Sequence, residues 1–137
     1  MDFKTLFETA RTIAVVGCSP RATRTSHGIA RYLQDAGYDV IPINPHHDEL
    51  LGVPCYPDLL SIPEDVEIDI VNIFRQPRFT LGVVQDAVDR NERTQENPVI
   101  WTQIGVSTQE AKQLAETHGL RYVANRCSMV EHSRFSY

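Results

Sequence analysis

The sequence predicts an α/β fold in which one parallel sheet carries helices on both faces. Short runs that are apolar at nearly every position alternate along the chain with segments whose apolar residues recur at helical spacing. Strands that are apolar on both faces are typical of parallel sheets buried between two layers of helices. We therefore expect an open sheet of about five strands in a single domain that covers residues 1–137.

Helices are expected in four regions, each marked by an apolar stripe or an end signal. The first two stripes are formed by Phe3, Leu6, Phe7 and Ala10 and by Ile29, Tyr32, Leu33 and Ala36. Gly37 lies where a cap would end the second helix. Pro77 fits the first turn of the third helix, whose expected buried stripe is Leu81, Val84, Ala87 and Val88. Ser107 and Glu110 predict a capping box at the start of the fourth helix, which Gly119 would end.

The expected strands are the apolar runs between these helices, at residues 12–17, 39–44, 68–74, 98–103 and 121–127. Pro42 cannot donate a hydrogen bond to a neighbouring strand, which indicates a strand end or a place at the sheet edge. The proline-rich and acidic residues 45–67 are expected to form a turn and a short extended piece. Residues 91–97 are expected to be a polar loop, and the residues after Cys127 a short polar tail.

Composition and charge exclude several classes of protein. The chain is 42% hydrophobic and 23% charged, with a net charge of −5. This acidic total argues against a nucleic-acid or membrane-surface partner, because both favour a basic face. No apolar run is long enough to span a bilayer, and the N-terminus has no signal-peptide pattern. The three cysteines are widely spaced and suit reduced thiols, so a cytoplasmic protein is expected.

The candidate binding residues follow the expected strands. In an open parallel sheet the ligand binds at the carboxyl ends of the strands, where the strand order reverses. The residues at these ends are Gly17, Cys18 and Ser19, then Asn44 and Pro45, then Phe74 and Arg75, then Gln103, Ile104 and Gly105, and finally Asn125, Arg126 and Cys127.

The loop after the first strand has the features of a phosphate-binding turn. Gly17 permits a tight turn, and the amides at the start of the following helix favour negative charge. Hydroxyl donors and two cationic donors follow in Ser19, Arg21, Arg24, Thr25 and Ser26. A basic loop within an acidic chain predicts a small phosphorylated ligand.

A nicotinamide dinucleotide fits this loop poorly. The G-x-G-x-x-G fingerprint needs two further glycines, and the chain has Ser19 and Ala22 in their places. The fingerprint also needs an acid after the second strand to bind the ribose hydroxyls, and the nearest acid there is Asp48. An NAD(P)-linked enzyme is therefore kept only as an alternative.

Four stretches of the chain resemble the small bacterial CoA-binding proteins of the YccU type, which are themselves similar to the CoA-binding domain of the succinyl-CoA ligase α subunit. The stretches lie in the same order, at residues 12–45, 56–75, 99–106 and 124–132. This resemblance implies a Rossmann-like domain with the CoA pyrophosphate near the first glycine loop. It implies contacts to phosphate from Gly17, Ser19, Arg24 and Ser26, to the adenosine end from Asn44, Pro45, Phe74 and Arg75, and to the pantetheine path from Gln103 and Gly105. Cys18 departs from the small or apolar residue expected at its position.

No catalytic and no metal site is expected. Cys127, Glu131 and His132 form the best candidate cluster, because an imidazole can activate a thiol. A cysteine that ends a buried strand is more often inert, and the three residues lack the spacing and the fourth ligand of a metal site. His46 and His47 are interpreted as part of a solvated turn.

The leading hypothesis is a stand-alone protein that binds CoA or acyl-CoA and has no chemistry of its own. The phosphorylated histidine and the partner domains of the ligases lie outside the CoA domain, and 137 residues leave no room for them. The alternatives are an NAD(P)-linked enzyme, a thiol-dependent enzyme that uses Cys18 or Cys127 on a nucleotide or acyl-CoA substrate, and a subunit of a ligase-like assembly or homo-oligomer. Because Cys18 lies near a helix start and two arginines, we expect its thiolate to be stabilised and reactive.

Overall fold

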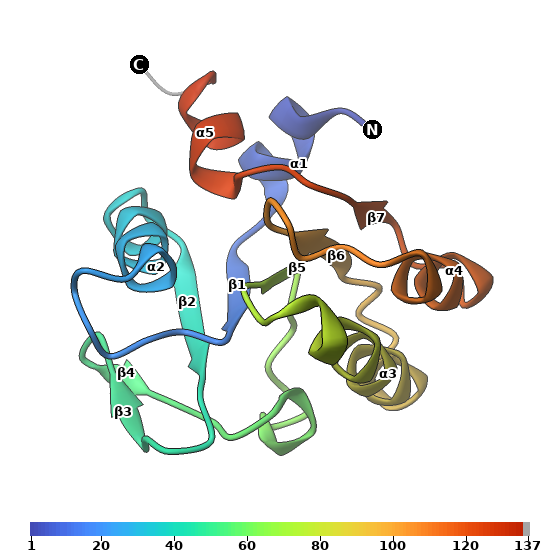
Figure 1. Cartoon of the computed structure of the whole chain (residues 1–137), viewed down its shortest axis with the longest axis horizontal. Helices are drawn as coiled ribbons and strands as arrows, with labels where there is room; N and C mark the ends of the chain where they lie inside the picture. Colours follow the sequence, from blue (N-terminus) through green and yellow to red (C-terminus); the bar gives the residue numbers. More distant parts are fainter. Residues whose placement is uncertain (136–137) are drawn as a thin grey trace.

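The main sheet contains five parallel strands, and the structure is a computed structural model that describes residues 1–135. The strands are β1 (Thr12–Val16), β2 (Asp39–Ile43), β5 (Ile70–Ile73), β6 (Val99–Thr102) and β7 (Tyr122–Val123). Their order is β2-β1-β5-β6-β7, so the order reverses between β1 and β5 (Figure 1). This is the doubly wound arrangement of a Rossmann-like domain, and it confirms the predicted fold class.

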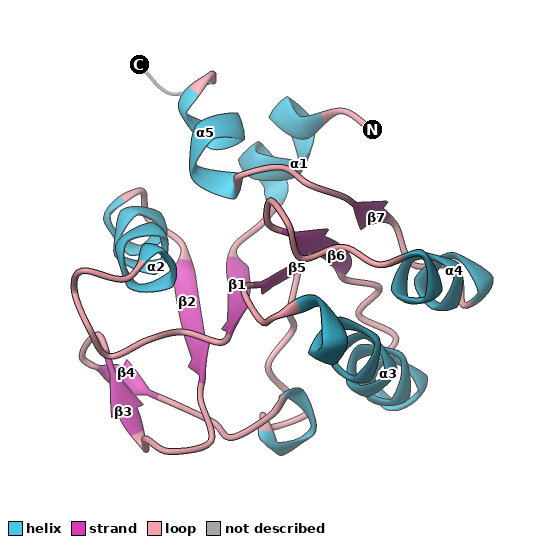
Figure 2. Cartoon of the chain, in the orientation of Figure 1, coloured by secondary structure: helices cyan, strands magenta, loops and turns pink. Residues whose placement is uncertain are grey.

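Helices cover both faces of this sheet (Figure 2). The helices are α1 (Phe3–Thr9), α2 (Thr25–Asp35), α3 (Pro77–Thr94), α4 (Gln109–Thr117) and α5 (Ser128–Ser133), with a 3₁₀ turn η1 (Leu59–Ser61). One buried cluster joins α1 and α2 to one face, and α5 packs against both of these helices. A second cluster joins α3, α4 and η1 to the other face.

Each central strand contributes side chains to both clusters, which explains the continuous apolar runs. In β1, Ile13 and Val15 face the first cluster, whereas Ala14 and Val16 face the second. Trp101 of β6 is fully buried in the first cluster, where its ring centroid lies 5.0 Å from that of Phe3. The two layers therefore hold the strands rigidly, and the strand ends are fixed points for a binding site.

Pro42 lies in β2, which forms one edge of the main sheet, as its missing amide donor predicts. The segment after β2 forms a small hairpin from β3 (Glu49–Leu50) and β4 (Val53–Pro54). The chain then returns to β2, where the amide of Tyr56 donates to the Pro42 carbonyl at 3.2 Å.

Five sequence predictions about the helices and strands were wrong. Helix α3 continues through Thr94, so the first half of the expected loop at 91–97 is helical, and Leu81 of its expected buried stripe is 43% exposed. Thr108 rather than Ser107 caps α4, because its side chain accepts from the Ala111 amide at 3.2 Å. The last strand is only two residues long, and the expected polar tail contains α5.

Candidate functional site

Gly17 forms the turn that ends β1. Its φ angle is +86°, in the region where side chains are strained, and a Cβ atom here would lie 3.0 Å from Cδ of Arg75. Both the backbone conformation and the close approach of Arg75 therefore require a glycine. The turn brings the ends of β1 and β5 together at the point where the strand order reverses.

The loop after Gly17 is held by its own hydrogen bonds. Ser26 Oγ accepts from the Ser19 amide at 3.0 Å, and Asn44 Nδ2 donates to the Cys18 carbonyl at 3.0 Å. The amides of Gly17 and Cys18 both donate to the carbonyl of Ile43, at 3.1 and 3.2 Å. The side chains of Ser26 and Asn44 thus hold the loop, and the backbone amides of residues 17–19 already have acceptors.

The free donors of this loop are at the start of α2. Arg24 is the N-cap residue and makes no side-chain capping bond, and the first turn contains no acid. The first amides of a helix have no partner within the helix, so this end attracts an anion. Arg21 and Arg24 are exposed beside it. Within this loop, the groups suited to an anion are therefore at the start of α2 and on Arg21 and Arg24, rather than on the glycine turn.

A pocket of about 400 Å³ opens at the carboxyl ends of β1, β2 and β5. Six of the predicted site residues line it, namely Gly17, Ser19, Asn44, Pro45, Phe74 and Arg75. Five further residues that the sequence analysis did not select also line it, namely Pro20, His46, Gln76, Arg78 and Phe79. Each of these five follows within a few residues of a predicted strand end. The pair of arginines after β5 was the signal that could have revealed Gln76, Arg78 and Phe79.

A smaller cavity of about 70 Å³ adjoins this pocket and shares Gly17, Pro45 and Arg75 with it. The carboxyl groups of Asp58 and Asp86 line the smaller cavity. Burial, followed by repulsion from Asp58, raises the pKa of Asp86. Arg75 therefore lines both the larger pocket and the smaller, acidic cavity.

The expectation for Cys18 was wrong. Its side chain is 0% exposed and packs in the first core cluster beneath the loop. Burial, with a smaller contribution from neighbouring Cys55, raises the pKa of the Cys18 thiol to about 11. The loop turns this side chain away from the helix start and the arginines that were expected to stabilise a thiolate.

The remaining predicted residues lie outside the pocket. Gln103 is 6% exposed at the end of β6, where its Oε1 accepts from Asn72 Nδ2 and from the Ser128 amide, both at 3.0 Å. Gly105 is exposed, and its amide donates to Asn125 Oδ1 at 3.1 Å. Gln103 and Gly105 thus lie at the β6 end of the same sheet edge, beyond the pocket lining.

Cys127, Glu131 and His132 do not form one site, because Glu131 and His132 have different partners. Glu131 is paired with Arg126 at 3.5 Å and with Arg134 at 3.2 Å. The ring of His132 is joined to the hydroxyl of Tyr32 by a hydrogen bond of 2.8 Å. Among residues 1–135 no group of three His, Cys, Asp or Glu side chains could hold a metal ion.

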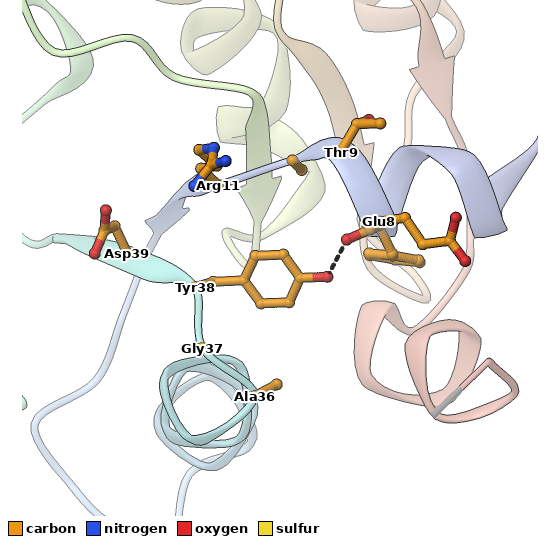
Figure 3. Close-up of a pocket in the computed structure, with 9 residues that line it drawn as sticks. Glu8, Thr9, Arg11, Ala36, Gly37, Tyr38 and Asp39 are labelled. Carbon is orange, nitrogen blue, oxygen red and sulfur yellow. Dashed lines mark hydrogen bonds between the residues drawn. The ribbon is translucent and has the colours of Figure 1, made fainter. Parts of the chain in front are cut away.

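Another pocket, of about 600 Å³, lies at the amino ends of β1 and β2, opposite the glycine loop (Figure 3). Tyr38 crosses it and donates a hydrogen bond from its hydroxyl to the Phe7 carbonyl at the end of α1. Doubly wound domains bind ligands at the other end of their strands. We therefore assign the candidate site to the pocket beside Gly17.

In the described part of the chain, no helix has both the length and the apolar character needed to cross a membrane.

The sheet topology and the glycine turn at the strand reversal define a Rossmann-like domain. The family model of the CoA binding domain matches residues 11–133, and the chain belongs to this family. This confirms the family that the sequence resembles.

Relatives of similar length support the same assignment. The chain is 38% identical to the uncharacterized protein YneT of Bacillus subtilis over 132 residues, which cover 96% of this chain and 93% of YneT. It is similar to the structure of a hypothetical protein from Pyrococcus horikoshii, with 36% identity, a TM-score of 0.87 and coverage of 98% and 92% of the two chains. A structure from Thermus thermophilus gives 30% identity, a TM-score of 0.88 and coverage of 98% and 99%.

A part of the chain is also similar to a much longer enzyme. The ADP-forming acetate–CoA ligase I of Archaeoglobus fulgidus is 38% identical over 61 residues, which cover 44% of this chain and only 9% of the ligase.

Proposed function

We propose that this chain is a stand-alone protein that binds CoA or acyl-CoA, with the pyrophosphate held at the start of α2. The observation that carries the proposal is the uncapped start of α2, flanked by Arg21 and Arg24, next to a pocket at the strand reversal. Membership of the CoA binding domain family supports the ligand. The near-complete coverage of YneT supports a protein of this size that acts without ligase domains.

The positions of the side chains support the following proposed contacts. Ser19, Arg21 and Arg24 bind the pyrophosphate, and Cys18 contributes to this loop through its backbone alone. The adenosine end lies against Asn44, Pro45, Phe74 and Arg75, which line the pocket. The pantetheine arm leaves the pocket along the sheet edge toward Gln103 and Gly105. Ser26 acts indirectly, since it holds the Ser19 amide.

The geometry of the loop favours CoA over NAD as the ligand, and it opposes a thiol-dependent reaction at Cys18. Asn44 stands at the end of β2, where an NAD site has an acid, and its amide group is engaged by the Cys18 carbonyl and the His46 amide. No carboxylate is thus offered to free ribose hydroxyls at this position. The burial and raised pKa of Cys18 oppose a nucleophilic role for its thiol.

Titration calorimetry of the purified chain with CoA, acetyl-CoA and NAD⁺ tests this proposal. We expect saturable binding of CoA and acetyl-CoA and much weaker binding of NAD⁺. Native mass spectrometry of the same preparation supplies an independent readout, because a retained CoA adds its own mass. Tighter binding of NAD⁺ than of CoA would overturn the proposal.

A further inference from the structure

Two arginines of the pocket are arranged around one aromatic ring. The guanidinium carbon of Arg75 lies 4.2 Å from the ring centroid of Phe79, and that of Arg78 lies 4.7 Å from the same centroid. Both distances are within the range of cation–π contacts. Phe79 therefore contacts both positive groups at the wall of the pocket.

These two charges are not neutralised by the protein. Within residues 1–135 neither guanidinium forms an ion pair or donates a hydrogen bond to another residue. Asp58 and Asp86 line the smaller cavity together with Arg75, but neither forms an ion pair with it. Two unpaired positive groups that line one pocket create a positive potential there, which favours an anionic ligand group. Guanidinium groups bind phosphate through paired, charge-assisted hydrogen bonds.

The arginine pair is distinct from the phosphate site proposed at α2. Arg75 and Arg78 come from the stretch between β5 and α3, whereas Arg21 and Arg24 come from the loop between β1 and α2. CoA carries negative charge in two separate places, the pyrophosphate and the 3′-phosphate of its ribose. The start of α2 and the neighbouring pocket thus offer two separate cationic groups to a ligand with two anionic groups, and in the proposed function the adenosine end of CoA lies against Arg75.

We propose that Arg75 and Arg78, held by Phe79, bind the 3′-phosphate of CoA and make the protein select CoA over dephospho-CoA. This inference rests on the proposed function, because it concerns the same pocket. Arg78 and Phe79 are then specificity residues. An adenine nucleotide without a 3′-phosphate offers the two arginines no anionic group to bind.

Calorimetry with CoA and dephospho-CoA at about 0.1 M salt tests the selection. We expect the wild-type chain to bind CoA about ten- to a hundredfold more tightly than dephospho-CoA, the range for a charged hydrogen-bonding group. We expect Arg78→Gln to remove most of this difference, because it weakens the binding of CoA and leaves the affinity for dephospho-CoA unchanged. Phe79→Leu reduces the same difference while both arginines are still present, because the ring no longer positions them.

Arg93→Gln is the matched control. Arg93 lies in the last turn of the same helix, about 22 Å from Arg78 at 1.5 Å per residue, and its removal changes the net charge equally. We expect it to leave the selection for CoA intact. Equal binding of CoA and dephospho-CoA by the wild-type chain would overturn this inference and leave the proposed function standing. Binding of neither would overturn the proposed function, and the inference with it.

Discussion

Arg90 and Glu96 form a buried ion pair in which Arg90 Nε lies 2.9 Å from Glu96 Oε2, and both side chains are 2% exposed. Arg90 also donates to four backbone carbonyls between residues 59 and 66, at 2.6–3.3 Å. Glu96 accepts from the amide of Ile68 at 3.0 Å through its other oxygen. This pair therefore ties the end of α3 to the segment that leads into β5, whose far end carries Phe74 and Arg75.

Arg90→Met is expected to lower the free energy of unfolding by about 3–5 kcal/mol, because it leaves the buried Glu96 carboxylate without its charged partner. Urea unfolding followed by circular dichroism measures this change. Arg93→Met on the exposed side of the same helix should change stability by no more than about 0.5 kcal/mol. A loss of less than about 1 kcal/mol in Arg90→Met would show that water replaces the pair at little cost.

Gly17→Val is expected to abolish CoA binding, because its side chain enters the space of Arg75 and strains a backbone at φ +86°. Gly37→Val is the matched control. Gly37 has φ +104°, but a Cβ atom at this position would meet no heavy atom of the surrounding structure within 4 Å, so the variant suffers similar strain without that collision. Calorimetry and thermal unfolding of both variants separate the collision with Arg75 from the backbone strain. Loss of CoA binding in both variants would show that lowered stability, and not the collision, abolishes binding.

Arg24→Ala is expected to weaken the binding of CoA and of dephospho-CoA equally, by about 1.5–3 kcal/mol of binding free energy. The two effects are equal because both ligands contain the pyrophosphate. The dependence of affinity on salt should also become shallower, because a screened charge contact is lost. Titrations at several salt concentrations measure both changes. An unchanged affinity together with an unchanged salt dependence would identify Arg24 as a solvated residue.

Cys18 is expected to resist alkylation in the folded protein, because it is fully buried and burial is the main reason that its pKa is raised to about 11. Iodoacetamide at pH 7.5 should label the half-buried Cys127 before Cys18, with or without CoA. Peptide mass mapping at timed intervals identifies the labelled cysteine. Rapid labelling of Cys18 in the native protein would contradict its position in the core.

His132 is expected to make the protein less stable in mild acid. Its ring packs edge-on against Phe7, Tyr32 and Tyr38, and burial lowers its pKa below the ordinary value of 6.5. In the unfolded chain this group binds a proton at a higher pH than in the folded protein. Its contribution to stability is therefore complete above about pH 6.5 and is lost as the pH falls through the lowered pKa.

Thermal unfolding between pH 7.5 and 5 measures this loss in the wild type and in His132→Phe, which keeps an aromatic ring in the cluster. The variant should lose less stability over that range, whereas His47→Gln, at an exposed position, should follow the wild type. Parallel pH profiles for all three proteins would assign the acid sensitivity to other groups.

The sequence predicted the order of strands and helices well because each central strand is buried on both sides. Ile13 and Val16 face opposite cores, so the run that contains them has to be apolar throughout. Pro42 likewise revealed the sheet edge through a property of its own backbone. These signals are local, and local signals can be read from a single chain.

The errors arose where distant contacts decided the outcome. The polar stretch after Arg90 was interpreted as a loop, since nothing nearby indicates that Arg90 and Glu96 find buried partners. The backbone at Cys18 is likewise held by a distant residue, since Asn44 donates to the Cys18 carbonyl across 26 positions of sequence. Strand ends could be found from the sequence, but which side chains turn into the pocket could not.

The internal hydrogen bonds of the loop at residues 17–19 have a thermodynamic consequence for association. Ser26, His27 and Asn44 bind the backbone of this loop before any ligand arrives. Fixing a mobile residue costs about 1–2 kcal/mol of conformational entropy, and a loop that is already ordered does not incur that cost when a ligand binds. Most of the favourable interaction energy between this loop and a bound phosphate should therefore contribute to affinity, because little of it has to offset the entropic cost of ordering the loop.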